Sequence, residues 1–423
     1  MHSGRSLRSL SGISAIALVL AGCGGTGTGA SASPAAKPSI FVQAATPVPN
    51  DSTPTLAASP TPAKTGGFTL AGKAFEFSGA FIPGWYWGLA SRTNDAKLLS
   101  SAKQAGITVL HLMPPLLVAA KCGVYDQTEF KALDLFLDQA SKQNIRVIIP
   151  FIHGLAMTQQ GHGALTSSYG IETLIKDPKF KACFVSYMKA VVQRVNTVNK
   201  RKYSADPTIF GWEIIEEPIS GEHNYPVRPP NVTLYEVRQW LDEMAKDLKA
   251  MDPNHLVGVQ FSAAAIDTTE LDDSSRSILD TPSLDFLEIE DGDVRVLQTE
   301  RSNHLYDSAF KTGKPVVLFL SFTGLSYPDP GQSTPNDARL AKACSDLAWQ
   351  ATTLSAEFTA YQKKGAAGYV VFSWRLPGTT PDPIDRCFSY STDTKLVFQA
   401  LQKINATLGG LNSPGTGFAS VAP

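Results

Sequence analysis

The sequence predicts a closed barrel of eight parallel strands with helices outside, the (β/α)8 or TIM-barrel class of α/β fold. From residue 68 onward, short apolar runs alternate with amphipathic stretches of helical period. Eight such runs occur over about 340 residues, which suits a barrel with long loops. Runs such as Val147-Ile148-Ile149 are apolar on both faces, as expected of strands covered by helices.

The elements follow one another in the order that this fold requires. The expected strands are Phe75–Ile82, Ile107–Met113, Arg146–Ile152, Ile209–Ile215, Leu256–Phe261, Leu284–Ile289, Pro315–Phe322 and Gly368–Trp374. The expected helices are Asp95–Gln104, Glu129–Gln143, Pro178–Val198, Leu234–Met251, Glu300–Thr312, Ala338–Lys364 and Thr394–Ile404, with a weaker pattern at Thr268–Ile278. An open doubly wound sheet is the alternative, but no glycine-rich phosphate loop follows the first strand. In a barrel, the chemistry lies at the carboxyl ends of the strands.

The first residues have the pattern of an export signal. Arg5 and Arg8 precede a short apolar run, Ile13–Leu20, which cannot span a bilayer. Leu20-Ala21-Gly22-Cys23 resembles the bacterial lipobox, in which the cysteine receives a diacylglycerol. We therefore expect an exported, membrane-anchored lipoprotein of the bacterial cell envelope. The alternative is an ordinary signal peptide in which Cys23 occurs by chance.

The predicted domain organisation is a signal at 1–23, a tether at 24–66, one folded domain at 67–411 and a flexible tail at 412–423. The tether is composed of Gly, Ser, Thr, Ala and Pro and has too little apolar surface to form a core. A net charge of −1 with mixed signs gives no reason to expect nucleic acid. We expect a monomer that uses no cofactor or metal.

Four cysteines follow Cys23, and no pair of them has the spacing of a metal site. Outside the cytoplasm they can form disulfides, with three full pairings available. Cys122–Cys183 and Cys344–Cys387 are the pairs that we expect, and buried free thiols are the alternative.

The fourth expected strand ends with Glu216-Glu217-Pro218. Adjacent carboxylates at a strand end are unusual in a purely structural site. Because side chains alternate along a strand, only one of the two needs to face the barrel axis. A pair of solvated loop glutamates is the alternative explanation.

This region resembles glycoside hydrolase family 5, most closely the β-mannanase branch. The resemblance covers about residues 70–405. The segments that carry it are Arg194–Thr197, Tyr203–Glu213, Glu217-Pro218, Asp252–Val257, Phe77–Ala80 and Lys314–Leu318.

The resemblance implies a retaining mechanism with two carboxyl groups ~5 Å apart. It places Glu217 at the acid/base position. Several residues depart from the family pattern. Glu216 replaces an asparagine and His111 an arginine, and Ser321 occupies the position of the nucleophilic glutamate. A serine there has no evident base to activate it.

Glu290 takes the place of an active-site histidine of the family, so it is our candidate for a relocated second carboxylate. It shares a strand face with Glu288. A polar network of these glutamates with His111 or a lysine is the alternative.

Aromatic side chains are candidates for stacking on sugar rings. Trp374 at the eighth strand maps to a sugar platform of the family, and Trp85 and Trp87 follow the first strand. Packing against the first helix is the alternative for this pair. His153, after the third strand, is a candidate sugar contact or a structural histidine.

These observations predict a glycoside hydrolase acting on β-mannan or a related β-linked polysaccharide. Because the seventh strand lacks its carboxylate, a non-catalytic glycan-binding lipoprotein on the same scaffold is the alternative.

Overall fold

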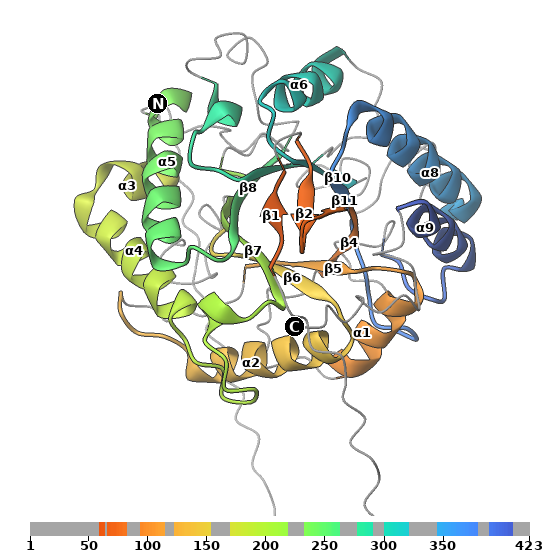
Figure 1. The fold of residues 1–423 in the computed structure, drawn as a ribbon, viewed down its shortest axis with the longest axis horizontal. Coiled ribbons are helices and arrows are strands. Elements are labelled where there is room, and N and C mark those ends of the chain that lie inside the picture. The colour runs from red at the N-terminus through yellow and green to blue at the C-terminus, as the bar shows by residue number, and fades with distance from the viewer. Residues whose placement is uncertain are drawn as a thin grey trace, which may run out of the picture. The chain divides into compact units, whose positions relative to one another are not determined.

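Eight parallel strands close into a barrel in the order β10-β11-β4-β5-β6-β7-β8-β9, with helices around the outside (Figure 1). The strands are β4 (Phe77–Ile82), β5 (Val109–Leu112), β6 (Arg146–Pro150), β7 (Ile209–Glu216), β8 (Leu256–Ser262), β9 (Phe286–Glu290), β10 (Val316–Leu320) and β11 (Gly368–Val371). This computed structural model describes residues 59–63, 66–82, 94–114, 122–153, 170–218, 232–262, 277–290, 300–320, 345–379 and 389–408. The predicted (β/α)8 class is confirmed.

The outer helices form largely where the amphipathic pattern predicts them. They are α1 (Asp95–Gln104), α2 (Gln127–Lys142), α3 (Gly170–Lys176), α4 (Pro178–Val192), α5 (Leu234–Met251), α6 (Glu300–Lys311), α8 (Leu347–Lys364) and α9 (Lys395–Thr407). The bounds of α1 and α5 match the prediction. Local capping explains the sharp start of α5, since Thr233 and Glu236 form a reciprocal capping box.

Helix α4 ends at Val192, six residues earlier than predicted, because a buried carboxylate organises the following turn. Asp134 on α2 accepts hydrogen bonds from the Arg194 guanidinium at 2.8 and 2.6 Å and from the Tyr203 hydroxyl at 2.7 Å. It also accepts from the Thr197 amide and hydroxyl. This network holds the segment that leads into β7.

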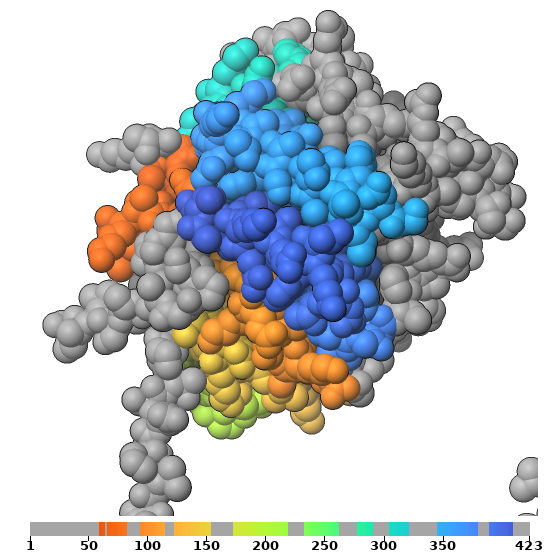
Figure 2. Space-filling model, turned by 90° about the vertical axis from the view of Figure 1, so that its right-hand side faces the viewer, coloured from red at the N-terminus to blue at the C-terminus, as the bar shows by residue number. Residues whose placement is uncertain are grey.

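The last helices close the ring against the first one. Figure 2 shows α8 and α9 side by side on the outer surface, with α1 next to α9. The Asn405 side chain donates to the Ala105 carbonyl at 2.5 Å, and Gln402 donates to Gln104. These bonds join segments about three hundred residues apart.

A small antiparallel sheet covers the amino-terminal end of the barrel. It consists of β1 (Thr61–Pro62), β2 (Phe68–Leu70) and β3 (Lys73–Phe75) and lies across the centre of the ring in Figure 1. The predicted single strand Phe75–Ile82 is wrong, because the chain leaves this sheet at Phe75 and enters the barrel at Phe77. The ring of Phe68 contacts those of Phe210 and Phe286, at 5.1 and 6.1 Å between centroids.

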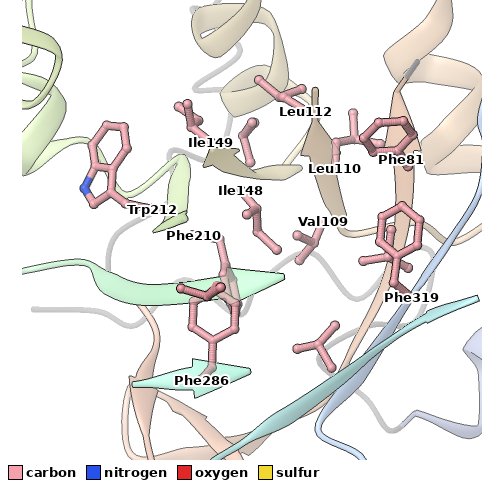
Figure 3. Packing of buried hydrophobic residues seen from close by; sticks show 14 of the residues in the cluster. Phe81, Val109, Leu110, Leu112, Ile148, Ile149, Phe210, Trp212, Phe286 and Phe319 are labelled. Atoms are coloured by element: carbon pink, nitrogen blue, oxygen red, sulfur yellow. The ribbon is translucent and has the colours of Figure 1, made fainter. Parts of the chain in front are cut away.

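The barrel interior is apolar at this end and becomes polar toward the carboxyl ends of the strands. Gly258 makes room for Phe286, since a Cβ atom at Gly258 would lie 2.3 Å from that ring. Further along the strands, Phe81 and Phe319 meet edge to face at 5.4 Å, and Figure 3 shows their rings next to each other. His111 packs edge to face against both rings, at 5.5 and 5.6 Å between centroids, so the polar side chains of the interior begin at this level.

The structure contains a disulfide between Cys122 and Cys183, which confirms one predicted pair. The other pair, Cys344–Cys387, and the signal and tail lie outside the described residues. The predicted end of the tether at residue 66 is wrong, because β1 (Thr61–Pro62) already pairs with β2 in the small sheet of the folded domain. Within the described ranges, none of the helices is long and apolar enough to cross a membrane.

Candidate active site

The carboxyl end of β7 carries three glutamates, and an irregularity in the strand determines where they point. Glu213 pairs with Gly258 of β8 and Glu216 pairs with Gln260, so three steps along β7 match two along β8. In a regular strand, residues three apart face opposite sides. Because the extra residue changes the alternation, Glu213 and Glu216 both reach the same histidine in the barrel interior.

That histidine is His111 of β5, which lies among three carboxylates. Its Nε2 is 3.1 Å from Glu213 and 2.9 Å from Glu216, and its Nδ1 is 2.6 Å from Glu288 of β9. All four side chains are buried. Glu288 therefore forms the polar network with His111 that the sequence offered as an alternative, and Glu216 belongs to the same network.

Burial controls the protonation of this network. Removal from water raises the pKa of Glu216 to about 8 and that of Glu288 to about 7, although His111 opposes both shifts. Burial lowers the pKa of His111, but the charges of Glu288 and Glu213 outweigh this and raise it well above its ordinary value. The network therefore retains protons near neutral pH.

His153 lies beside this network. Its Nε2 is 3.7 Å from the second oxygen of Glu216, and the two residues form a parallel bridge beyond β6. Burial, followed by the nearby charge of His111, lowers the pKa of His153 to about 4. A neutral His153 can therefore donate or accept a hydrogen bond near pH 7, as a polar sugar contact requires.

Glu217 lies directly beyond β7, at the carboxyl end of the barrel. Its backbone has φ = 49°, in the left-handed region that residues other than glycine rarely adopt. Its amide donates to the Gln260 carbonyl at 3.0 Å, and the residue is 6% exposed. Strained backbone is common at functional sites, where the surrounding contacts maintain it.

Gln260 of β8 is a residue that sequence reasoning missed. Besides accepting from the Glu217 amide, it donates from its side chain to Glu290 at 3.0 Å. It thus joins the predicted acid/base to the predicted second carboxylate. The available signal was a lone amide in the otherwise apolar run of residues 256–261.

Trp374 does not lie where a sugar platform is needed, so its predicted role is wrong. The side chain is fully buried, and its indole nitrogen donates to the Ser101 hydroxyl of α1 at 3.0 Å. It therefore packs between the barrel and its outer helix. Near the end of β11, Phe372 is the ring that packs with the inner aromatic residues, stacking on Phe81 at 5.2 Å.

The remaining predicted site residues, Ser321, Trp85 and Trp87, lie outside the described residues, as does Cys23. The structure brings together His111, His153 and Glu216. Through Gln260 it also links Glu217 with Glu290. Apart from Trp374, the predicted site residues that the structure describes therefore lie at one end of the barrel.

Comparison with known proteins confirms the predicted resemblance. Residues 167–289 match the model of the GH family 5 beta-mannosidase-like family. Mannan endo-1,4-beta-mannosidase 8 of Oryza sativa subsp. japonica is 33% identical over 32% of this chain and 36% of its own length. Mannan endo-1,4-beta-mannosidase 1 of the same plant is 25% identical over 68% of this chain and 60% of its own length. The chain thus spans about a third to three fifths of the length of these relatives.

Solved structures share the fold. An endo-1,4-beta-mannanase from Rhizomucor miehei superposes with a TM-score of 0.58 at 19% identity, covering 82% of this chain and 99% of that one. The endo-beta-1,4-mannanase from Thermotoga petrophila gives 0.56 at 18% identity, over 79% and 78% of the two chains. At these identities the likeness concerns the barrel itself.

Proposed function

We propose that this protein is a glycoside hydrolase that acts on β-1,4-mannan or a related β-linked polysaccharide, with Glu217 as the acid/base. One observation carries the proposal. The segment that matches the family 5 mannosidase-like model includes β7, and Glu217 follows β7 at the carboxyl end of a closed barrel. That end is where barrel enzymes place their chemistry.

Glycoside hydrolysis needs an acid that protonates the leaving oxygen and a second carboxylate that attacks the sugar or activates water. Glu290 is our candidate for the second group, since Gln260 connects its carboxylate to the backbone of Glu217. His153, Glu216 and His111 are the candidates for polar contacts to the sugar or for positioning these carboxylates.

The direct test measures reducing ends released from a panel of polysaccharides by the full chain in detergent. We expect release from mannan and glucomannan and none from xylan. Glu217→Gln should abolish release while leaving thermal unfolding unchanged, because the amide keeps the shape but cannot supply the proton. Glu243→Gln, on the exposed side of α5, is the matched control.

The same assay separates the proposal from its alternative. Ser321 stands where the resemblance places the nucleophile, an observation that favours a non-catalytic glycan-binding protein. Oligosaccharide binding in calorimetry without any reducing ends would support that alternative and reject the hydrolase. Loss of activity in Glu290→Gln would support Glu290 as the second carboxylate.

We also propose that the protein is exported as a monomer and anchored in the bacterial envelope through a lipid on Cys23. The lipobox-like sequence supports this, and the Cys122–Cys183 disulfide suits an oxidising compartment. Cys23→Ser should move the protein from the membrane to the soluble fraction and prevent incorporation of labelled palmitate. Membrane retention of the unlabelled variant would contradict the anchor. Light scattering in detergent measures the mass of the protein and tests whether it is a monomer.

A further inference from the structure

The barrel interior contains a compact group of potential metal ligands. His111, Glu213 and Glu288 come from β5, β7 and β9, and one donor atom from each lies within 4.8 Å of the others. All three side chains are buried. The oxygen of Glu216 that lies 2.9 Å from His111 places a third carboxylate beside them.

When its carboxyl groups are ionised, this group carries more negative than positive charge. Among the described residues, the ion pairs of Glu213, Glu216 and Glu288 are all made with His111 or His153. A protonated His111 offsets one negative charge, while three carboxylates surround it. Buried charges are stable only when they are paired, neutralised by a proton or bound to a cation.

Several acceptor atoms of this group have no hydrogen-bond donor among the described residues. Among the residues that the structure describes, no donor reaches the second oxygens of Glu213 and Glu288, which are buried and make no ion pair with His111. The same described part of the chain offers no donor to the buried side-chain oxygen of Gln260, which lies opposite Glu288 in the sheet register. Each such oxygen loses its hydration on folding and gains no replacement, unless a cation supplies it.

We propose that His111, Glu213 and Glu288 bind one divalent transition-metal ion, such as Zn²⁺ or Mn²⁺, in the barrel interior. An imidazole nitrogen with two carboxylates is a donor set that suits these ions. Bonds of about 2.0–2.2 Å place neighbouring donors roughly 3.0–3.5 Å apart, so the 3.1 Å between His111 and Glu213 is already suitable.

The three donors can meet at one ring nitrogen of His111 after one side chain turns. As the side chains lie, Glu213 and Glu216 are at Nε2 and Glu288 is at Nδ1. With the ion on Nε2 beside Glu213, the Glu288 carboxylate turns from Nδ1 toward the ion, and the donor atoms of the three residues already lie within 4.8 Å of one another. The bound ion joins β5, β7 and β9 below Glu217, whether or not the protein hydrolyses glycans.

Metal analysis of the full chain tests the proposal. The protein is unfolded with chelator, refolded with Zn²⁺ or with Mn²⁺, dialysed, and analysed by mass spectrometry for metal. We expect about one ion per chain in the wild type and in Glu243→Gln. The variants His111→Asn and Glu288→Gln should each retain at least tenfold less metal per chain. Equal metal content in all four proteins would overturn the proposal.

A second measurement needs no variant to fold. Wild-type protein refolded with Cu²⁺ should show nitrogen coupling from one imidazole in its electron paramagnetic resonance spectrum. The Zn²⁺-loaded wild type should unfold at a higher temperature than the chelator-treated protein. Absence of nitrogen coupling together with identical unfolding temperatures would overturn the metal site and leave protons as the neutralising charge.

Discussion

Replacing Asp134 with alanine should destabilise the protein severely, because this buried carboxylate organises the turn that leads into β7. Asp134 accepts five hydrogen bonds, two of them from the Arg194 guanidinium. A bond to a charged group contributes about 1.5–3 kcal/mol, but bonds within one network do not add. Breaking a buried ion pair costs about 3–5 kcal/mol. Arg194 retains some contact with water, so we expect the lower end, about 3 kcal/mol.

Urea unfolding followed by tryptophan fluorescence measures this loss. Asp134→Asn is the matched variant, since it keeps the side-chain volume and one acceptor oxygen, and its loss should lie between those of wild type and alanine. A loss below about 1 kcal/mol in Asp134→Ala would refute the reasoning, since that is the effect of a single ordinary hydrogen bond.

The pH dependence checks the same network. Burial raises the pKa of Asp134, but hydrogen bonds from Arg194, Tyr203 and Thr197 outweigh it, so the folded-state pKa lies below the ordinary value of 3.8. The carboxylate therefore stabilises the fold above pH 3.8, and this contribution is lost as the pH falls through the lowered pKa. The stability difference between wild type and Asp134→Asn should be constant near neutral pH and shrink in acid. A difference independent of pH down to 2 would contradict the role of the charge.

Three further variants test the packing of the barrel and its outer layer. Gly258→Ala should lower the free energy of unfolding in urea by about 1–3 kcal/mol, because its methyl group overlaps the ring of Phe286. An unchanged free energy of unfolding would mean that the residues around Phe286 are not tightly packed. The double variant Cys122→Ser, Cys183→Ser should have a free energy of unfolding about 4 kcal/mol lower, since the disulfide closes a loop with a sequence separation of 61. Reduction of the wild-type disulfide should lower the free energy of unfolding by the same amount. Trp374→Phe should lower stability by about 1 kcal/mol through the lost indole hydrogen bond, while oligosaccharide affinity in calorimetry stays unchanged. Weakened binding in a stably folded Trp374→Phe would restore it as a sugar contact.

Much of the barrel could be predicted, because strand and helix periodicity report local burial. Helices α1 and α5 have one apolar face each, and both were predicted at their observed bounds. The error at Phe75–Ile82 arose because Phe75 and Phe77 both pack in the same core, so the apolar pattern continues across a change of sheet. Periodicity cannot detect a break that leaves burial unaltered.

The site could be predicted less well, because its residues depend on departures from regular strands. Strict alternation separates Glu213 from Glu216, whereas the irregularity in β7 brings both to His111. Similarly, Trp374 lies two residues after Phe372, which in a continuous strand would place both rings on one face. β11 ends at Val371, so Phe372 packs with the inner aromatic residues and Trp374 packs toward α1.

The position of Glu217 follows from the same irregularity. After the extra residue in β7, the backbone turns into the left-handed region at Glu217, and the amide of that residue bonds to Gln260. Gln260 therefore holds the Glu217 backbone with its carbonyl and the Glu290 carboxylate with its side chain. Because both glutamates depend on one strand of the barrel wall, the geometry of the proposed catalytic pair depends on the packing of β8 as well as on the two acids themselves.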